Sequence, residues 1–190
     1  MKKLICLFLT FFSIYSFSQN GYLEYGYVES LGIGNAKGSD YNSYMKFNNE
    51  MSYYVTAKDS LEKVEKINKE KVTYTDDDQG SVNISSGMKV SKEGDQVVYH
   101  IKKNTMWSNF LFKEQIYVKE VTPIINWKIS KETKKIGKFN CKKATANFRG
   151  RNYTAWFTID IPLPFGPWKL QGLPGLILEA YDTNKNLYWY

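Results

Sequence analysis

The feature that most constrains the fold is a succession of short apolar and aromatic segments that runs from residue 81 to the end of the chain. Turn residues separate these segments, at 92–95, 134–137 and 150–151. The candidate strands lie at residues 81–85, 88–91, 96–102, 107–113, 115–121, 126–132, 140–148, 152–159 and 176–181. Many short strands joined by turns predict an antiparallel sheet, because parallel strands need long crossover connections.

The N-terminal part adds three strands to this pattern. Residues 21–30 alternate between two faces and predict a first strand, and residues 31–40 predict a loop. Residues 41–47 and 50–57 predict a hairpin around Asn48-Asn49, because asparagine tolerates positive φ. Residues 60–71 have apolar residues at a spacing of three and Glu/Lys pairs four apart, unlike the alternating segments around them. They fit either a short amphipathic helix or an exposed, mobile insertion. We therefore expect a mostly β protein with little helix.

Composition agrees with a globular β protein. The chain has 15 Tyr, 11 Phe and 5 Trp, and aromatic rings suit the half-buried surface of a pleated sheet. Charged residues make up 24% and hydrophobic residues 43%, as in ordinary globular proteins. Residues 19–190 are expected to form a single β-rich domain. Because residues 187–190 look like the middle of a strand, we expect that the chain is truncated at its C-terminus.

The first 18 residues have the pattern of a secretory signal peptide. Lys2 and Lys3 precede an apolar run at residues 4–15, and Ser16 and Ser18 supply small residues before the expected cleavage site. A membrane anchor is the alternative, but the run is shorter than the ~20 residues that span a bilayer. We therefore expect an exported protein, periplasmic or extracellular, with no transmembrane segment after cleavage.

Few residues have the pattern of a catalytic or metal site. His100 is the only histidine and has no second ligand at metal spacing, and no nucleophile motif accompanies it. The three aspartates at 76–78 do not fit a calcium loop, because its twelfth position would be Gly87. Asp160 and Glu179 are carboxylates near the proline-rich segment, but nothing places them together. We predict no catalytic, metal or cofactor-binding residue.

Charge and cysteine content exclude two further classes of site. The net charge of +7 is spread thinly, with lysines mixed among acidic residues, which argues against a nucleic-acid partner. Cys141 is the only cysteine after signal cleavage, so no internal disulfide is expected. We favour a buried thiol over a reactive one. Trp156 is expected in the core. For Arg151 we favour a structural salt bridge with Asp160 across a hairpin over a contact with a substrate.

Four of the five prolines fall between residues 162 and 174, which excludes an interior strand there. We predict an ordered extended loop in which Phe165 and Trp168 are packing anchors. Residues 173–176 suit a type II turn with Gly175 at positive φ, and Gly172 would allow a close backbone approach. The candidate structural or interaction residues of this loop are Pro162, Phe165, Gly166, Pro167, Trp168, Gly172, Leu173, Pro174 and Gly175. The following strand is apolar on both faces, as a strand buried on both sides would be.

The sequence GLPGLI at residues 172–177 resembles the naming motif of the GLPGLI family of exported proteins from Gram-negative bacteria. The resemblance extends over residues 126–182. The positions that match the family pattern are Trp127, Cys141, Ala144, Gly150, Arg151, Ala155, Trp156, Pro162, Gly166, Pro167, Gly172, Leu173, Pro174 and Gly175. The resemblance implies export but no activity, cofactor or catalytic residue. By analogy with periplasmic lipoprotein carriers, whose strand order is similar, it implies a curved antiparallel half-barrel with an apolar concave face.

Two functions from different classes fit these features. The first is a non-catalytic envelope binding protein that holds an apolar ligand or a partner's hydrophobic segment in the concave face. The alternative is an assembly module that contacts an outer-membrane or secreted protein through the proline-rich loop, with Phe165 and Trp168, and the sheet edge. An enzyme of unknown class, built on Cys141 and His100, ranks third.

Overall fold

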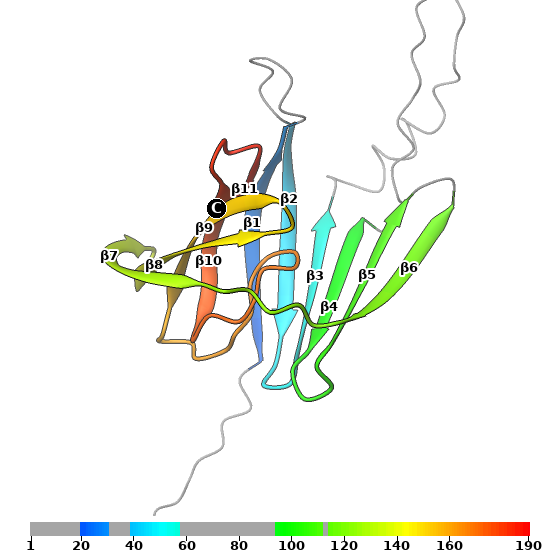
Figure 1. Ribbon diagram of the computed structural model, residues 1–190, viewed down its shortest axis with the longest axis horizontal. Coiled ribbons are helices and arrows are strands. Elements are labelled where there is room, and N and C mark those ends of the chain that lie inside the picture. Colours follow the sequence, from blue (N-terminus) through cyan, green and yellow to red (C-terminus); the bar gives the residue numbers. More distant parts are fainter. Residues whose placement is uncertain (1–19, 31–38, 58–93, 112–113) are drawn as a thin grey trace, which may run out of the picture.

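Eleven strands form one antiparallel sheet in the computed structural model, which describes residues 20–30, 39–57, 94–111 and 114–190 (Figure 1). The strands are β1 (Gly21–Glu29), β2 (Ser39–Phe47), β3 (Met51–Ala57), β4 (Asp95–His100), β5 (Thr105–Leu111), β6 (Gln115–Val121), β7 (Lys128–Ile136), β8 (Phe139–Phe148), β9 (Arg151–Thr158), β10 (Leu176–Asp182) and β11 (Leu187–Trp189). Within these ranges there is no helix. The predicted mostly β, antiparallel class is confirmed.

The order of strands requires the sheet to curve. It reads β6-β5-β4-β3-β2-β1-β11-β10-β9-β8-β7, so the consecutive strands β6 and β7 form opposite edges. A flat sheet would separate those edges by roughly 48 Å, at about 4.8 Å per strand. Residues 122–127, which connect them, can span at most roughly 25 Å. The sheet therefore bends toward this connection, which crosses in front of it in Figure 1. The predicted curved sheet is confirmed, and its edges stay open.

The N-terminal hairpin forms as predicted, but for a different local reason. β2 and β3 pair from Phe47 with Ser52 onward, around Asn48-Asn49. Neither asparagine adopts positive φ. Instead, the Asn48 side-chain oxygen accepts hydrogen bonds from the backbone N–H groups of Glu50 at 2.8 Å and Met51 at 2.9 Å. The side chain, rather than a left-handed backbone, closes this turn.

Two predicted turns are displaced. The turn predicted at 134–137 is wrong, because β7 continues to Ile136, which pairs with Phe139 across a two-residue turn. The turn predicted at 150–151 lies one residue earlier, at Arg149-Gly150, where φ is 49° and 79°. Two positive φ values match the twist of the flanking strands. Arg151 is consequently the first residue of β9 and lies opposite Phe148.

Several predictions lie outside the described residues. They are the signal peptide at 1–18, the candidate helix at 60–71, the rejected calcium loop at the aspartates 76–78 and the candidate strands at 81–85 and 88–91. These remain predictions.

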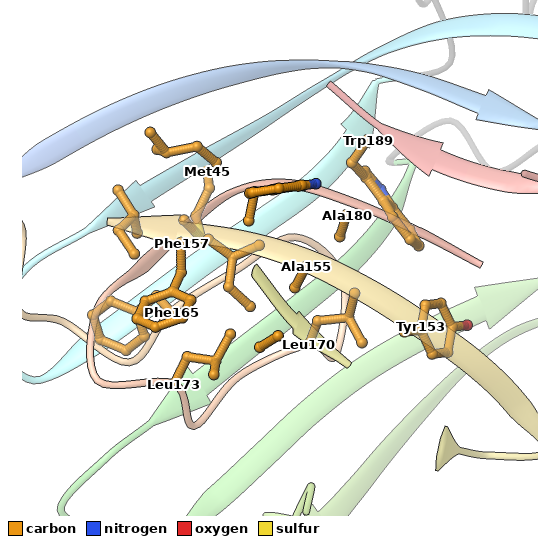
Figure 2. Packing of buried hydrophobic residues seen from close by; sticks show 14 of the residues in the cluster. Met45, Tyr153, Ala155, Phe157, Phe165, Leu170, Leu173, Ala180 and Trp189 are labelled. Atoms are coloured by element: carbon orange, nitrogen blue, oxygen red, sulfur yellow. The ribbon is translucent and has the colours of Figure 1, made fainter. Parts of the chain in front are cut away.

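The concave face, toward which the sheet curves, is filled by the proline-rich connection between β9 and β10. We call residues 159–175 the plug segment. As predicted, it forms no strand. Figure 2 shows its apolar side chains in the same cluster as those of the sheet. Its most deeply buried apolar residues are Leu163, Phe165, Leu170 and Leu173. The Phe165 ring contacts Phe47 of β2 and Tyr99 of β4, with ring centroids 6.1 Å and 5.8 Å apart. Most of the space inside the curved sheet is therefore occupied by the chain itself.

The connection at 122–127 holds the plug segment in place. The Gln171 side chain donates a hydrogen bond to the Pro123 carbonyl oxygen at 2.6 Å. The Trp127 indole N–H donates to the Gln171 carbonyl oxygen at 2.9 Å. The plug segment also bonds β10, because the Ile177 N–H donates to the Phe165 carbonyl oxygen at 2.9 Å. Side-chain and backbone bonds thus fix the plug segment between the sheet and its crossing connection.

The two glycines of the motif have exchanged their predicted roles. The type II turn with positive φ at Gly175 is wrong, because Gly172 has the positive φ, at 90°. Gly175 instead lies against the neighbouring strand, where an added Cβ would meet the Thr158 carbonyl oxygen at 2.0 Å. The close approach therefore belongs to Gly175. The strand that follows is buried on both faces at Leu176, Ile177 and Leu178, as predicted.

Candidate binding site

A cleft of about 290 Å³ remains on the concave face beside the plug segment. Side chains from β1, β3, β4, β5 and β11 line it, together with two residues of the plug segment. Its aromatic residues include Tyr27, Trp168 and Trp189, and its polar residues include Glu29, Thr56, Asp95, Ser108 and Lys169. Strand pairing explains this gathering, because Thr56 pairs with Asp95 and Glu29 pairs with Leu187 on the same inward face.

Three aromatic rings form a continuous stack along one wall of the cleft. Tyr27 and Trp189 pair across β1 and β11, and their rings lie 5.2 Å apart at an interplanar angle of 16°. Trp168 of the plug segment continues the stack, 6.4 Å from Trp189 at 12°. The Trp189 indole N–H donates to the Tyr54 hydroxyl at 2.8 Å. This bond orients the middle ring, so the stack is a fixed surface.

The backbone at Trp168 is strained. Its φ of 51° lies in the left-handed region, which bulky residues seldom adopt. Packing against Phe148, at 6.0 Å between ring centroids, and Tyr153, at 6.5 Å, holds the indole there. Strain of this kind, of order 1–3 kcal/mol, persists where the surroundings enforce it and is concentrated at functional sites. The strained residue is also the predicted loop anchor that lies in the cleft.

Among the described residues around the cleft, carboxylates outnumber cations. Glu29 and Asp95 line it directly. The Lys169 ammonium donates to the Glu120 carboxylate at 2.6 Å, and Glu120 also accepts a 2.6 Å bond from Arg149. Partial burial acts to raise the pKa of Glu120, but the bonds and charges of Lys169 and Arg149 outweigh it and hold that pKa below its ordinary value. Lys169 is thus already engaged by an acidic partner.

Tyr27, which lines the cleft, and Tyr54, which bonds Trp189 of the stack, stay protonated. Burial raises the pKa of Tyr27 far above its usual value, and the negative charge of Glu29 raises it further. Burial likewise raises the pKa of Tyr54 to about 12, although three hydrogen bonds act in the opposite direction. Neither phenol supplies a base near neutral pH. What the cleft offers is aromatic surface, hydroxyl groups and carboxylates.

Two wider hollows in the described residues have a different character. One, of about 520 Å³, is lined mainly by polar side chains of β7, β8 and β9, including Asn147 and Thr154. The other, of about 590 Å³, lies over the ends of β1, β2 and β3 at Tyr22 and Lys46. Neither includes the buried aromatic stack or a carboxylate. The 290 Å³ cleft combines both and is our candidate site.

The candidate loop residues divide between the core and the surface. Phe165, Gly166, Pro167, Leu173 and Gly175 are buried, whereas Pro162, Gly172 and Pro174 are exposed. Trp168 is the member of the set that lines the cleft. Sequence reasoning did not identify the other side chains of the cleft. Alternation within each strand places them on the inward face, but only the pairing of distant strands brings them together.

Arg151 has a different partner from the one predicted. Its guanidinium donates to Asp182 of β10 at 2.8 Å, so the predicted pair with Asp160 is wrong. Asp182 is 3% exposed, and its second oxygen accepts a hydrogen bond from the Leu187 N–H at 3.2 Å. The displaced turn explains the difference, because Arg151 opens β9 and lies beside the end of β10. This ion pair fixes the turn before β11.

Cys141 and Trp156 lie outside the cleft. Cys141 is fully buried as a free thiol, as predicted, and burial raises its pKa. Trp156 is buried, as predicted, and the Lys134 ammonium lies 4.7 Å from the centre of its ring. Lys134 also forms an ion pair with Glu179. His100 lies on β4, elsewhere in the order of strands from Cys141 on β8.

The described residues carry no grouping of three or more His, Cys, Asp or Glu side chains that could hold a metal ion. In the same ranges, no helix is long and apolar enough to cross a membrane.

The fold and the cleft together define an antiparallel β-sheet protein with a plugged concave face and a small aromatic binding cleft. Residues 149–179 match the family model described as "Protein of unknown function (Porph_ging)". This segment contains the GLPGLI motif, so the match supports the family resemblance that the sequence indicated. The comparison with curated proteins finds no significant match.

Solved structures share the fold at low sequence identity. The "Structure of PNGF-II in C2 space group" aligns with a TM-score of 0.54 and 18% identity over 90% of this chain. The "Structure of PNGF-II in P21 space group" aligns with the same score and identity over 88% of this chain. The chain spans only about a quarter of those proteins, 26% and 27% respectively. At this identity the likeness concerns the fold alone.

Proposed function

We propose that this protein is an exported, non-catalytic binding protein of the cell envelope. It holds a short apolar group, from a ligand or from a partner's hydrophobic segment, in the concave cleft. The observation that carries the proposal is the cleft itself, about 290 Å³ in volume with the stack of Tyr27, Trp189 and Trp168 as one wall. Export rests on the signal-peptide pattern of residues 1–18.

The size of the cleft limits what enters it. Binding sites for small molecules usually measure ~300–1,000 Å³, so this cleft lies at the lower end. The plug segment fills the rest of the concave face with Phe165, Leu170 and Leu173, each essentially inaccessible to solvent. A long acyl chain would have to displace these side chains. A compact group, or one side chain of a partner, enters without rearranging the core.

The assembly-module alternative draws less support from the geometry. It relied on Phe165 and Trp168 as contact residues, but Phe165 is 0% exposed and packs against Phe47 and Tyr99. Trp168 is half-buried within the aromatic stack. The proline-rich segment acts chiefly as core in this fold. The enzyme alternative gains nothing either, because Cys141 is buried and no base is directed at it in the described contacts.

A neutral fluorescent probe tests the proposal. N-phenyl-1-naphthylamine brightens in apolar sites, so we expect saturable brightening with the wild-type protein. Trp168→Ala, which removes one end of the stack, should weaken probe binding at least tenfold. Trp107→Ala is the control, because Trp107 is an exposed tryptophan of β5 that does not line the cleft.

A second variant separates binding from folding. Ser108→Phe fills the cleft from β5 and should also weaken probe binding, with thermal unfolding used to check that both variants are folded. Equal probe binding by the wild type and by folded Trp168→Ala and Ser108→Phe proteins would refute the proposed site.

A further inference from the structure

We infer that the group held in the cleft carries a positive charge: the cleft selects a substituted ammonium group over neutral and anionic groups of the same shape. This inference rests on the proposed function, because it names the ligand class of the same cleft. It follows from three properties of the lining, which are its aromatic rings, the excess of carboxylates among its described residues and its volume.

The aromatic wall is a stack whose rings cover one another: Tyr27 and Trp189 are 7% and 2% exposed, and the half-buried end ring, Trp168, is the one that a ligand can reach. Tyr27, Trp189 and Trp168 are nearly parallel, and the Trp189 ring is held by its bond to Tyr54. A cation within ~6 Å of the centre of such a ring is attracted by the negative charge on the ring face, and Trp gives the strongest attraction. The chain makes this contact elsewhere, where Lys134 lies 4.7 Å from the centre of the Trp156 ring.

The carboxylates add directional charge. Glu29 and Asp95 line the cleft on separate strands, β1 and β4. Lys169, which is the lining cation among the described residues, donates to Glu120, which also accepts from Arg149. Counting these five groups gives three carboxylates and two cations. The negative charge of Glu29 also contributes to the raised pKa of Tyr27. A carboxylate ligand would be repelled here, although the whole chain has a net charge of +7.

The volume suits a compact cation. About 290 Å³ accommodates a trimethylammonium group and a short stem, whose methyl groups bury apolar surface against the rings. The hydroxyl groups of Thr56 and Ser108 line the same space and can bond a polar end of the stem.

Three probes of matched shape test the inference: choline, the neutral 3,3-dimethyl-1-butanol and the anion 3,3-dimethylbutanoate. Choline carries a trimethylammonium group on a two-carbon stem that ends in a hydroxyl. The alcohol has a tert-butyl group in its place, and the anion has a tert-butyl group and ends in a carboxylate. Calorimetry and quenching of tryptophan fluorescence measure binding to the full chain at low salt. We expect choline to bind at least tenfold more tightly than the alcohol, and the anion to bind most weakly.

Isosteric variants locate the charge selection. In Glu29→Gln combined with Asp95→Asn, choline affinity should fall to that of the alcohol, while alcohol affinity changes less than twofold. Glu24→Gln is the matched control, because Glu24 lies on the same strand as Glu29 but outside the cleft and bonds the Tyr22 hydroxyl. It should bind choline like the wild type.

The outcomes separate this inference from the proposed function. If the alcohol binds as tightly as choline and Trp168→Ala abolishes both, the cleft is an apolar site and the charge inference is overturned. If choline preference survives in the double variant, the inference is also overturned. If none of the three probes binds, and N-phenyl-1-naphthylamine binds Trp168→Ala as tightly as it binds the wild type, the proposed function itself fails.

Discussion

The carboxylate of Glu120, on the edge strand β6, accepts a 2.6 Å hydrogen bond from Arg149 in the turn between β8 and β9. These elements belong to opposite flanks of the sheet, on either side of β1. The same carboxylate accepts a bond from Lys169 of the plug segment. Glu120 thus connects one flank, the other flank and the plug segment, and it helps to hold the curved sheet around its contents.

Removing the charge of Glu120 should destabilise the protein in a pH-dependent way. Glu120→Gln weakens two charge-assisted bonds, and because Arg149 is 42% exposed we expect a loss of only about 1 kcal/mol in the free energy of unfolding at pH 7. The folded-state pKa of Glu120 lies below its ordinary value, so the carboxylate stabilises the fold above that ordinary value. The stabilisation is lost as the pH falls through the folded-state pKa.

Urea unfolding of the wild type and Glu120→Gln at several pH values measures this effect. The difference between them should be largest near neutral pH and should shrink below about pH 4.3, the ordinary carboxyl range. A difference that grows on acidification would contradict the assignment. Glu132→Gln serves as a control, because Glu132 pairs with Lys143 and is 60% exposed.

Phe165 should be among the most sensitive positions of the plug segment. Its ring is fully buried against Phe47 and Tyr99, so Phe165→Ala should lower the free energy of unfolding by about 3–5 kcal/mol. Ile124 lies in the crossing connection and is 87% exposed, so Ile124→Ala should change stability by less than about 0.5 kcal/mol. Chemical denaturation of both variants checks the contrast, and similar losses at the two positions would contradict the packing.

The exchanged roles of Gly172 and Gly175 predict different responses to asparagine. Gly172→Ala should cost about 1–2 kcal/mol through its positive φ, and Gly172→Asn should recover part of that loss, since asparagine tolerates this region. At Gly175 the obstacle is the Thr158 carbonyl oxygen, so Ala and Asn should both destabilise and Asn should recover nothing. Thermal unfolding of the four variants distinguishes strain from collision. Recovery by asparagine at Gly175 would show that the collision is absent.

Cys141 should be chemically silent in the folded protein. It is 0% exposed, and burial raises the pKa of its thiol, so a disulfide reagent at pH 8 should label it only after unfolding. Lys142→Cys introduces a thiol at the adjacent exposed position and should react rapidly. Cys141→Ala should leave probe binding in the cleft unchanged. Fast labelling of native Cys141 would contradict its burial.

Local sequence patterns predicted most of the strands because alternation and turn residues act within a few positions. Residues 115–121 form β6 with the boundaries that alternation indicated. The errors occurred where the local sequence allows a turn to start at any of several adjacent residues. Lys134, for example, continues β7 instead of starting the turn. The sequence predicted that Phe165 of the proline-rich loop is a packing anchor. It did not predict which residues of β2 and β4 Phe165 packs against.

The cleft could not be predicted in the same way. Tyr27 and Trp189 become neighbours only because β11 inserts between β1 and β10, and no local signal specifies that pairing. Glu29 and Asp95 likewise come from strands with no proximity in sequence. Side-chain alternation could nominate each residue as inward-facing, but the composition of the site depends on the long-range order of the strands.

That insertion of β11 has a consequence for assembly of the chain. The seam between β1 and β11 joins the first and last described strands, and contacts so remote in sequence carry the greatest loop-closure cost and slow folding. Because Tyr27 and Trp189 meet at that seam, the aromatic wall forms only once β11 has paired with β1, and a chain cut before residue 187 lacks it.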